Sequence, residues 1–576
     1  MKIVVVGGVA AGASAAARAR RLDESAEIVV LERGRFVSFA NCGLPYHIGG
    51  EIPERESLLL QTPESLAASL NLDVRTGHEV LAIDTDANEI DVRDLSADAT
   101  YRESYDKLVL CPGAEPVRPP IPGADLERVD VLRNVPDMDR IIARMDAGAT
   151  RALIIGGSAI GLETAEGFRA KGLETTVVEM GDRLMPWLGR EMTRILHFHV
   201  ELHGVDVRLS TSATSIREEG GQLVVDLSDG ASLEVDIVVL AAGVRPNASL
   251  ARDAGIAIGP RGGIVVDPQM RTSEPDVLAA GDAVETAHFY TGEPVLSMLA
   301  GPANRQGRIA ANTIFDRDSA YRGTQGTGIV KIFDMTAGGT GMTETDLTRH
   351  GIAYRKVYTH QNGHAEYYPG TSPMFVKALF APDDGALLGA QVLGWDGVDK
   401  RIDVLSVALA AGMTVFDLKH LELAYAPPYG SAKDPVNMIG FQASNLLLGD
   451  LDLWYPEDYP ACADTVTILD VRSLVEYEHW HVAEAISIPY TELRARLDEV
   501  PRDRPVYTYC RSGFRSYIAY RILTQSGFDE VASLSGGMIT FHGFHRTPLK
   551  VGEGGRPVVT YAEDILAQRP GVLDHI

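Results

Sequence analysis

Cysteine is scarce in this sequence. Four residues, Cys42, Cys111, Cys462 and Cys510, are spread over 576 positions. So few thiols, so far apart, do not make the disulfide framework that stabilises many secreted domains. We therefore expect a reducing compartment, the cytoplasm, with Cys111 and Cys462 as structural or incidental thiols.

The sequence also has no uncharged apolar run of about 18 residues, so we expect no membrane span. Lys and Arg are outnumbered by Asp and Glu, 53 against 79, which leaves a formal net charge of −26. Such a field repels phosphate backbones and anionic lipid, which argues against nucleic acid and membranes as partners. With 45 % hydrophobic residues and no low-complexity tract, the chain is typical of soluble enzymes with several cores.

A βαβ unit opens the chain. We predict a β-branched strand over 3–6, a glycine-rich turn over 7–12, a helix over 13–22 and a second strand over 28–31. Such a turn lets the backbone approach a pyrophosphate, and the helix N-terminus presents free N–H groups to it. The acidic residue after the second strand binds a ribose diol. The candidate dinucleotide-binding residues are Gly7, Gly8, Ala11, Gly12 and Glu32.

The same unit recurs, with a strand over 152–155, a turn over 156–161, a helix over 162–171 and a strand over 175–178. Two units in one chain imply two dinucleotides. The carboxylate after the last strand would repel a 2′-phosphate and so favours NADH, although Arg183 could soften that preference and NADPH stays possible. The candidate NAD-binding residues are Gly156, Gly157, Ile160, Gly161 and Glu179.

Three further segments complete a resemblance over residues 1–446 to the flavoprotein disulfide reductases that bind two dinucleotides. Residues 272–282, Thr-Ser-Glu-Pro-Asp-Val followed by Ala-Gly-Asp, resemble that family's second flavin motif, in which Gly281 and Asp282 would hold the ribityl chain of FAD. Residues 110–114, Leu-Cys-Pro-Gly-Ala, resemble its crossover strand, with Gly113 near the flavin. The resemblance implies FAD in the first unit and NADH in the second.

Most members of the wider family carry a C-x4-C disulfide, which this chain lacks. Residues 38–46, Ser-Phe-Ala-Asn-Cys-Gly-Leu-Pro-Tyr, instead resemble the single-cysteine branch, which includes coenzyme A disulfide reductases, NADH-dependent persulfide reductases, and NADH oxidases and peroxidases. The resemblance implies that Asn41 contacts FAD, and that Ser38 and Asn41 line the substrate site.

Cys42 is the candidate nucleophile. It stands just before an expected helix start with Pro45 in the first turn, so we expect a depressed pKa and a reactive thiolate. With no resolving cysteine beside it, Cys42 must form its mixed disulfide or persulfide with the substrate itself.

By the same resemblance, Tyr367 and Tyr425 would reach Cys42 of a partner subunit and donate to a leaving sulfur, with Tyr368 or Tyr429 as substitutes. A homodimer follows, with residues 326–446 as its dimerisation domain and a core helix over 404–413.

Arg18 and Arg21 could bind the phosphates of coenzyme A. Arginines late on a surface helix are, however, more often solvated charge, and that second interpretation stays slightly preferred.

The C-terminal segment resembles rhodanese sulfurtransferases over 464–550, including Leu-Ser-Gly-Gly at 534–537. We predict strands over 466–469, 486–489 and 506–509, the last running into Cys510 and then a helix over 516–524. A cradle of backbone N–H groups with Arg511 and Arg515 would lower the pKa of Cys510 and hold a persulfide. A small phosphatase is the less favoured alternative, because no separate general acid is evident.

The predicted fold is α/β, with two Rossmann-like dinucleotide-binding domains, an α+β dimerisation domain and a C-terminal α/β rhodanese-like domain. The predicted segments are FAD-binding (1–110), a crossover that returns to the FAD domain (111–150), NAD-binding (151–245), FAD-binding again (246–325), dimerisation (326–446), a linker (447–463), rhodanese-like (464–550) and a tail (551–576).

The predicted function is FAD-dependent reduction of persulfide, polysulfide or coenzyme A persulfide by NAD(P)H at Cys42, while Cys510 binds and transfers sulfane sulfur. Coenzyme A is then a substrate or bound ligand, and the partners are small sulfur compounds. A coenzyme A disulfide reductase is the nearest alternative. An NADH oxidase or peroxidase, and a sulfur carrier with a redox-sensing flavoprotein half, are the others. No metal site is expected.

Overall fold

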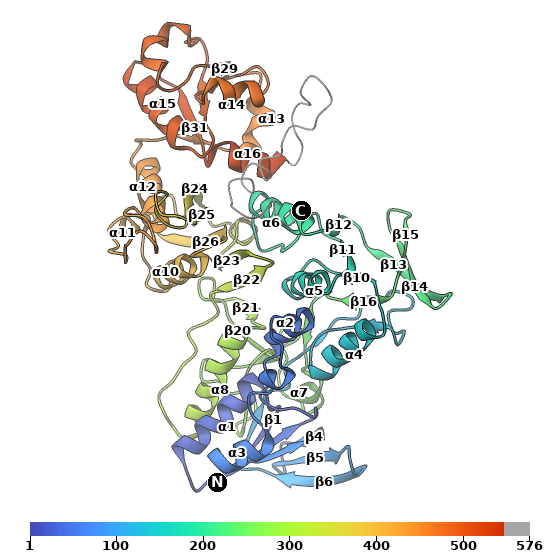
Figure 1. Cartoon of the computed structure of the whole chain (residues 1–576). Helices are drawn as coiled ribbons and strands as arrows, with labels where there is room; N and C mark the ends of the chain where they lie inside the picture. Colours follow the sequence, from blue (N-terminus) through green and yellow to red (C-terminus); the bar gives the residue numbers. More distant parts are fainter. Residues whose placement is uncertain (546–576) are drawn as a thin grey trace. The chain divides into compact units, whose positions relative to one another are not determined.

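The computed structural model describes residues 1–545 (Figure 1). The described chain forms two compact units: unit 1 is residues 1–180 and 211–325, and unit 2 is residues 181–210 and 326–545. The expected NAD-binding segment 151–245 is thus divided, because residues 181–210 associate with unit 2. The expected tail 551–576 and the last five residues of the segment 464–550 lie outside the described residues.

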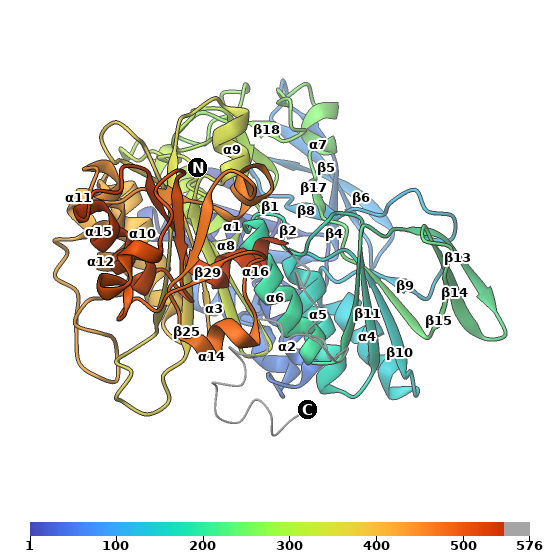
Figure 2. The same cartoon turned by 90° about the horizontal axis from the view of Figure 1, so that it is seen from above.

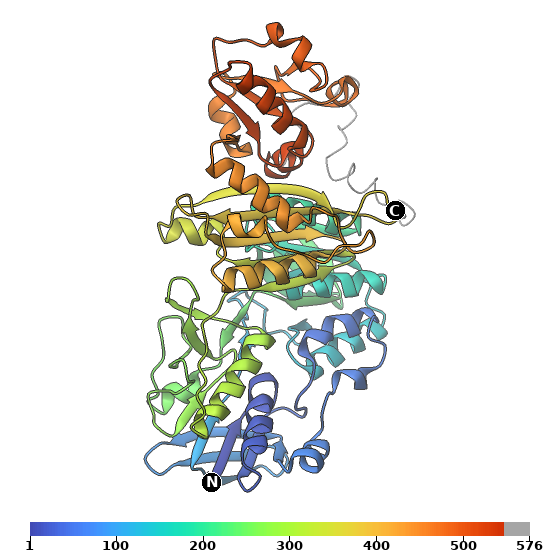
Figure 3. The same cartoon turned by 90° about the vertical axis from the view of Figure 1, so that its left-hand side faces the viewer.

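A parallel five-stranded sheet, in the order β19-β7-β1-β2-β3, forms the base of unit 1. Apart from the charged residues at their ends, its central strands consist of β-branched and leucine residues that are almost fully buried, as expected for strands covered on both faces. Helices α1 and α8 lie side by side against it (Figure 3). Its first elements are β1 (Lys2–Val6), α1 (Ala10–Leu22), β2 (Glu27–Glu32), η1 (Asn41–Gly43), α2 (Leu44–Gly49), η2 (Arg55–Leu58), α3 (Pro63–Leu70), β3 (Asp73–Thr76), β4 (His78–Asp84), β5 (Glu89–Asp94), β6 (Ala99–Ser104), β7 (Lys107–Leu110) and β8 (Ala114–Pro116).

The second βαβ unit follows, with its strands in the order β11-β10-β16-β9. An antiparallel sheet of β13, β14 and β15 extends to one side (Figure 2). The elements are β9 (Val129–Asp130), α4 (Val135–Asp146), β10 (Arg151–Ile155), α5 (Ala159–Ala170), β11 (Glu174–Glu179), β13 (Ala213–Glu219), β14 (Gln222–Leu227), β15 (Ser232–Val235), β16 (Ile237–Leu240) and β17 (Val244–Pro246). The chain then returns to the first sheet through α7 (Ser249–Asp253), β18 (Ile264–Val265), β19 (Val277–Ala279), β20 (Val284–Ala287), β21 (Pro294–Leu296) and α8 (Ala300–Ile314).

Unit 2 contains an antiparallel sheet in the order β22-β23-β26-β25-β24. Helix α10 packs on β23 and β26, and α12 packs on β24. The core helix expected over 404–413 begins six residues earlier and ends three earlier. The elements are α6 (Arg190–Leu202), β12 (Val205–Leu209), β22 (Gly328–Ile332), β23 (Met335–Gly341), α9 (Glu344–Arg349), β24 (Arg355–Asn362), β25 (Pro373–Phe380), β26 (Leu387–Gly394), α10 (Val398–Ala410), α11 (Val415–Leu418) and α12 (Pro435–Leu447).

The rest of unit 2 is a parallel sheet in the order β27-β31-β30-β28-β29. The expected linker 447–463 needs correction, because Leu453 and Trp454 form the edge strand of this sheet and Trp454 is 1 % exposed. The elements are β27 (Leu453–Trp454), η3 (Pro456–Asp458), α13 (Tyr459–Cys462), β28 (Thr467–Asp470), α14 (Leu474–His479), β29 (Ile486–Ser487), η4 (Leu493–Ala495), η5 (Leu497–Glu499), β30 (Val506–Tyr509), α15 (Phe514–Gln525), β31 (Val531–Leu534) and α16 (Gly537–His545).

Three predicted helices begin two or three residues too late. Helices α1, α5 and α15 start at Ala10, Ala159 and Phe514, so the end of each cysteine or glycine loop is already the first helical turn. The N–H groups of that turn have no partner inside the helix and are the ones offered to an anion. Within residues 1–545, no helix has the length and apolar character needed to cross a bilayer.

Candidate active site

A cleft of about 450 Å³ opens in unit 1 at the carboxyl ends of β1, β2, β7 and β19. Ligands of open parallel sheets bind at this edge, beyond the ends of the strands. The cleft brings together several predicted residues that are far apart in the sequence: Gly7, Ala11, Gly12, Glu32, Asn41, Cys42, Gly113, Gly281 and Asp282.

The first turn accepts only glycine at two positions. Gly7 has φ of +98°, and a Cβ there would lie 2.1 Å from the carbonyl oxygen of Cys111. A Cβ on Gly12 would lie 1.8 Å from the carbonyl oxygen of Gly7, so the turn and helix α1 could not pack. Without side chains at these two positions, a dinucleotide pyrophosphate can come close to the backbone of the turn.

Glu32 ends β2 with its carboxylate fixed at the rim of the cleft. Oε2 accepts the N–H of Gly8 (2.8 Å) and Oε1 accepts the N–H of Gly34 (2.7 Å). A carboxylate held in this way can bind a ribose diol, so the residues present fit FAD.

Asp282 lies deeper in the cleft, where Arg133 pairs with it at 3.1 Å. Burial raises the pKa of this carboxyl, and the guanidinium of Arg133 opposes that rise. The N–H of Gly281, beside it, donates to Oε1 of Gln306 (2.8 Å). The sequence did not indicate Arg133 or Gln306, because each meets its partner only through the tertiary fold.

Cys42 lies in η1, and the short helix α2 follows with Pro45 in its first turn, as predicted. The expected depression of its pKa is not found. Partial burial in the cleft raises the pKa of the thiol, and the carboxylates of Glu163 and Asp282 raise it further, against the opposing charge of Arg133. The sequence signal for a helix start could not reveal a carboxylate 121 residues away, and α2 has only six residues to act on the thiol.

The second thiol in the cleft is Cys111, which is also free. Burial raises its pKa to about 12, so it stays protonated near neutral pH. A protonated thiol is a poor nucleophile, which agrees with the expectation that Cys111 is a structural or incidental thiol.

The second glycine turn repeats the geometry of the first. Gly156 has φ of +119°, and a Cβ on Gly161 would lie 2.3 Å from the carbonyl oxygen of Gly156. Glu179 accepts the N–H of Gly157 through Oε2 at 2.7 Å, as Glu32 does from Gly8. Ile160 lies in the first turn of α5. These residues fit a second dinucleotide.

Ser38 and the arginines of α1 lie elsewhere in unit 1. Ser38 precedes η1 in a left-handed conformation, φ +46°, with its N–H donated to the carbonyl of Gly8. The guanidinium of Arg18 donates to Asn312 Oδ1 (2.8 Å). Its pKa is lowered by desolvation and then by the nearby like charges Arg308, Arg21 and Arg317. The chain is acidic overall, yet four arginines gather here.

Tyr367 and Tyr425 meet in unit 2. Their hydroxyl groups are 2.9 Å apart, and the side chains are 75 % and 48 % exposed. The hydrogen bond to Tyr425 raises the pKa of Tyr367. The structure thus joins the two tyrosines that were predicted as a pair, while no hydrogen bond joins either of them to the hydroxyl of Tyr368 or Tyr429.

Cys510 follows β30 at the base of a loop and is 1 % exposed. Its Sγ accepts the N–H of Gly513 (3.2 Å) and lies 3.5 Å from Ser516 Oγ. The predicted cradle of several N–H groups is therefore seen as one backbone N–H, because the Ser516 hydroxyl accepts from the thiol and donates to the carbonyl of Gly513. Arg511 contributes its carbonyl, which accepts the N–H of Ile539.

Arg515 reaches across to α14, where both of its terminal nitrogens donate to the carboxylate of Glu476 at 2.7 Å. Glu476 is a residue that sequence reasoning missed. Burial raises its pKa, but Arg515 and Ser473 outweigh that effect and bring it to about 2. The pair fixes the guanidinium beside the loop.

The chain matches three family descriptions. Residues 1–307 match pyridine nucleotide-disulphide oxidoreductase, residues 327–434 match the dimerisation domain of that family, and residues 459–543 match the rhodanese-like domain.

Curated relatives cover the first three quarters of the chain. A coenzyme A disulfide reductase from Staphylococcus haemolyticus is 34 % identical over 447 residues, 77 % of this chain and all of that protein. An NADH oxidase from Methanocaldococcus jannaschii is 34 % identical over 76 % of this chain and 97 % of its own.

Solved structures cover nearly the whole chain. The reduced CoADR-RHD protein of Bacillus anthracis is 45 % identical, with a TM-score of 0.92 over 94 % of this chain and 98 % of that one. A NAD-dependent persulfide reductase from A. fulgidus is 38 % identical, with a TM-score of 0.89 over 94 % of this chain and all of the other.

Proposed function

Because the chain belongs to the pyridine nucleotide-disulphide oxidoreductase family, we propose that it reduces the S–S bonds of persulfides, polysulfides or coenzyme A persulfide with NADH. It is a flavin-dependent oxidoreductase with a fused rhodanese-like domain. The observation that carries the substrate proposal is Cys42, an exposed free thiol on the wall of the dinucleotide cleft. Without a partner cysteine, its sulfur must pair with that of the substrate.

The chemistry starts with the thiolate of Cys42, which attacks the outer sulfur of R–S–SH. The Cys42 S–S bond forms as the substrate S–S bond breaks, which leaves Cys42–S–SH and RS⁻. A bound FAD would supply two electrons taken from NADH, returning Cys42 to a thiolate and releasing HS⁻. Arg133 favours the thiolate at both ends of this cycle, since its charge lowers the pKa of Cys42.

The tyrosine pair supports a homodimer in which each site uses residues of both subunits. Tyr367 and Tyr425 share one hydrogen bond and present exposed hydroxyls, so one O–H can donate to the other and that one to a departing thiolate. The dimerisation domain that contains them is consistent with this arrangement.

Cys510 would accept sulfane sulfur as a persulfide. Its Sγ already accepts one N–H, and the nearby guanidinium of Arg515 supplies the positive charge that anionic sulfur needs. Fusion of the two thiol centres raises the local concentration of one for the other.

Two further features bear on cofactor and compartment. Glu179 occupies the ribose position of the second dinucleotide site, where a carboxylate disfavours a 2′-phosphate, so we expect a preference for NADH over NADPH. All four cysteines are free thiols, which suits the reducing cytoplasm.

A coenzyme A disulfide reductase is the second candidate, and the four-arginine cluster around Arg18 favours a substrate with phosphates. The same cluster suits coenzyme A persulfide, so it supports binding of a coenzyme A group by either candidate and does not separate the two. An oxidase is the third, since a relative has that name.

Comparing NADH turnover on coenzyme A persulfide, on coenzyme A disulfide and on oxygen alone separates the three. We expect kcat/KM for the persulfide to exceed that for the disulfide by at least about tenfold, with little oxygen-driven turnover. Cys510→Ala should reduce turnover on polysulfide and leave turnover on the disulfide unchanged, with Cys462→Ala as the matched control. Faster turnover on the disulfide would favour the second candidate, and NADH consumption on oxygen alone the third.

A further inference from the structure

Two histidines and one aspartate lie together in unit 2. None of the three lines the cleft, and all are distant in sequence from Cys42 and Cys510. His199 belongs to α6, His203 is the C-cap of that helix, and Asp334 lies in the turn between β22 and β23. Each can offer one ligand atom, and these atoms lie within 4.8 Å of one another. We propose that this cluster binds a divalent transition metal ion, and that zinc is the metal it suits best.

His199 provides the strongest argument. Its side chain is 1 % exposed, yet neither ring nitrogen makes a hydrogen bond. Buried polar groups normally have a partner, because leaving one unpaired costs free energy. Its Nε2 lies 3.0 Å from Asp334 Oδ1, an ion-pair contact without the geometry of a hydrogen bond. Two ligands bound at about 2.0 Å to one tetrahedral zinc ion are about 3.3 Å apart, so this spacing fits shared coordination.

His203 has the orientation of a metal-binding imidazole. Its Nδ1 lies 2.8 Å from the carbonyl oxygen of His199, so Nδ1 carries the proton and Nε2 keeps the lone pair. Metal-binding histidines commonly donate their other N–H to a backbone carbonyl in this manner. The ring also stacks on Phe333, with centroids 4.2 Å apart at 15°, which limits its rotation.

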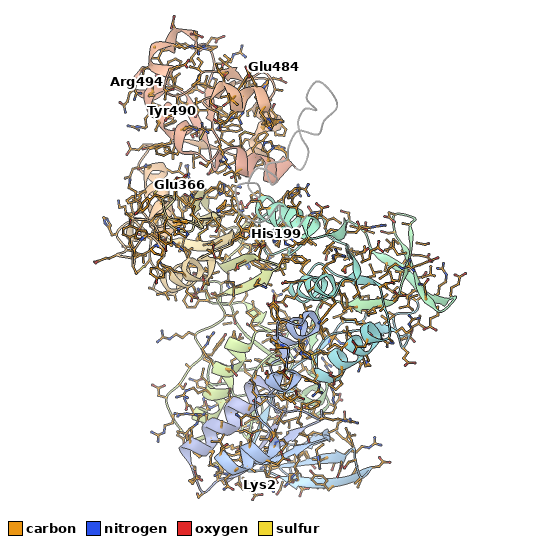
Figure 4. The ribbon with its side chains drawn as sticks, in the orientation of Figure 1. Lys2, His199, Glu366, Glu484, Tyr490 and Arg494 are labelled. Atoms are coloured by element: carbon orange, nitrogen blue, oxygen red, sulfur yellow. The ribbon has the colours of Figure 1, made fainter. Side chains whose placement is uncertain are left out.

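The sequence spacing supplies the geometry. Residues four apart lie on the same face of a helix, so His199 and His203 are neighbours at the C-terminal end of α6. Figure 4 labels His199 on this helix. A third donor from the β22–β23 turn gives two nitrogens and one oxygen, a set typical of zinc sites that keep a fourth position open to water.

Zinc bound here would join α6 to the β22–β23 hairpin, two elements of unit 2 that are more than 120 residues apart in the chain. The neighbouring pair His197 and Glu201, 3.2 Å apart on α6, is a separate ion pair and leaves the cluster its own ligands. The proposed ion is independent of the proposed reduction at Cys42.

The test uses the full-length, FAD-loaded protein, stripped with chelator and then dialysed against zinc alone. Elemental analysis should find one zinc ion per chain in the wild type. His203→Gln and Asp334→Asn should each weaken binding by at least about tenfold, because each removes one of three ligands. His420→Gln, an exposed histidine of the same unit, is the matched control and should bind as the wild type does.

Zinc can also bind cysteine thiolates, so the ligand type must be measured. X-ray absorption at the zinc edge should show a shell of nitrogen and oxygen at about 2.0–2.1 Å and no sulfur at about 2.3 Å. FAD absorbance and circular dichroism verify folding. If His203→Gln folds poorly, the result for Asp334→Asn, which changes a residue in an exposed turn, decides the test. A wild-type protein without zinc, a sulfur shell, or full zinc content in both cluster variants would overturn the proposal.

Discussion

Charge around Cys42 determines how much of this thiol is ionised. Burial and the carboxylates of Glu163 and Asp282 all raise its pKa, and Arg133 alone lowers it. The reactive form is the thiolate, so the same neighbours set the rate of the first step. Substitutions beside Cys42 therefore act on chemistry without touching the sulfur.

Glu163→Gln should make Cys42 more reactive at neutral pH. Removing a negative charge favours the thiolate, so the pKa falls and more of the thiol is ionised at a given pH. We expect alkylation by iodoacetamide to accelerate severalfold at pH 7.5, with its pH profile displaced to lower pH. Glu174→Gln, on an exposed residue of β11, is the control, and an unchanged profile in Glu163→Gln would contradict this account.

Gly12→Ala tests the fit of the first dinucleotide site at one atom. The added methyl would lie 1.8 Å from the carbonyl of Gly7, so the turn must open. We expect the purified variant to lose most of its FAD absorbance. Gly301→Ala, in the first turn of α8, adds a methyl where the nearest atom is 3.9 Å away and should retain the cofactor; equal FAD content in the two variants would contradict the fit.

At the scale of elements, the strand-turn-helix units carried most of what the sequence could predict. The turn around Gly7 and Gly12 could be predicted, because a turn that only glycine can adopt leaves a recognisable glycine spacing in the sequence. The edge strand at Leu453 and Trp454 was missed, since a strand of two residues carries no periodicity. Its signal was the tryptophan, which was too large an apolar side chain for a solvated linker.

The charges around the two reactive thiols were less predictable than the fold, because they come from distant parts of the chain. Cys42 and Cys510 stand in recognisable local motifs. Glu163 and Arg133 act on Cys42, and Glu476 holds Arg515 near Cys510, and one sequence does not show which distant charges meet. The expected depression of the pKa of Cys42 was wrong because the sequence did not show that Glu163 and Asp282 lie near this thiol.

Helix α14 and the Cys510 loop are connected by the Arg515–Glu476 pair, so Arg515→Lys tests that link. Lysine keeps the charge but cannot make two parallel hydrogen bonds to one carboxylate. We expect sulfur transfer from the Cys510 persulfide to cyanide to slow by about tenfold. Arg494→Lys, on the exposed turn η4, is the matched control (Figure 4), and equal rates in both variants would show that the bidentate pair is dispensable.

At the scale of the whole molecule, each proposed active site combines Cys42 of one subunit with Tyr367 and Tyr425 of the other. Cys42→Ser should be inactive, and the double variant Tyr367→Phe/Tyr425→Phe should be strongly impaired. Mixed and allowed to exchange subunits, they form heterodimers with one intact site, so activity should recover to about one quarter of the wild type. Tyr429→Phe in place of the double variant controls for the loss of an exposed hydroxyl, and no recovery would mean that the tyrosines do not act across the dimer.

The most direct test of the central claim is mass spectrometry of the peptide that contains Cys42, from protein incubated with coenzyme A persulfide before and after NADH. The account predicts one added sulfur on Cys42 before NADH and an unmodified thiol afterwards, with sulfide released in equal amount. An unmodified Cys42 before NADH, in protein that still turns over this substrate, would contradict it.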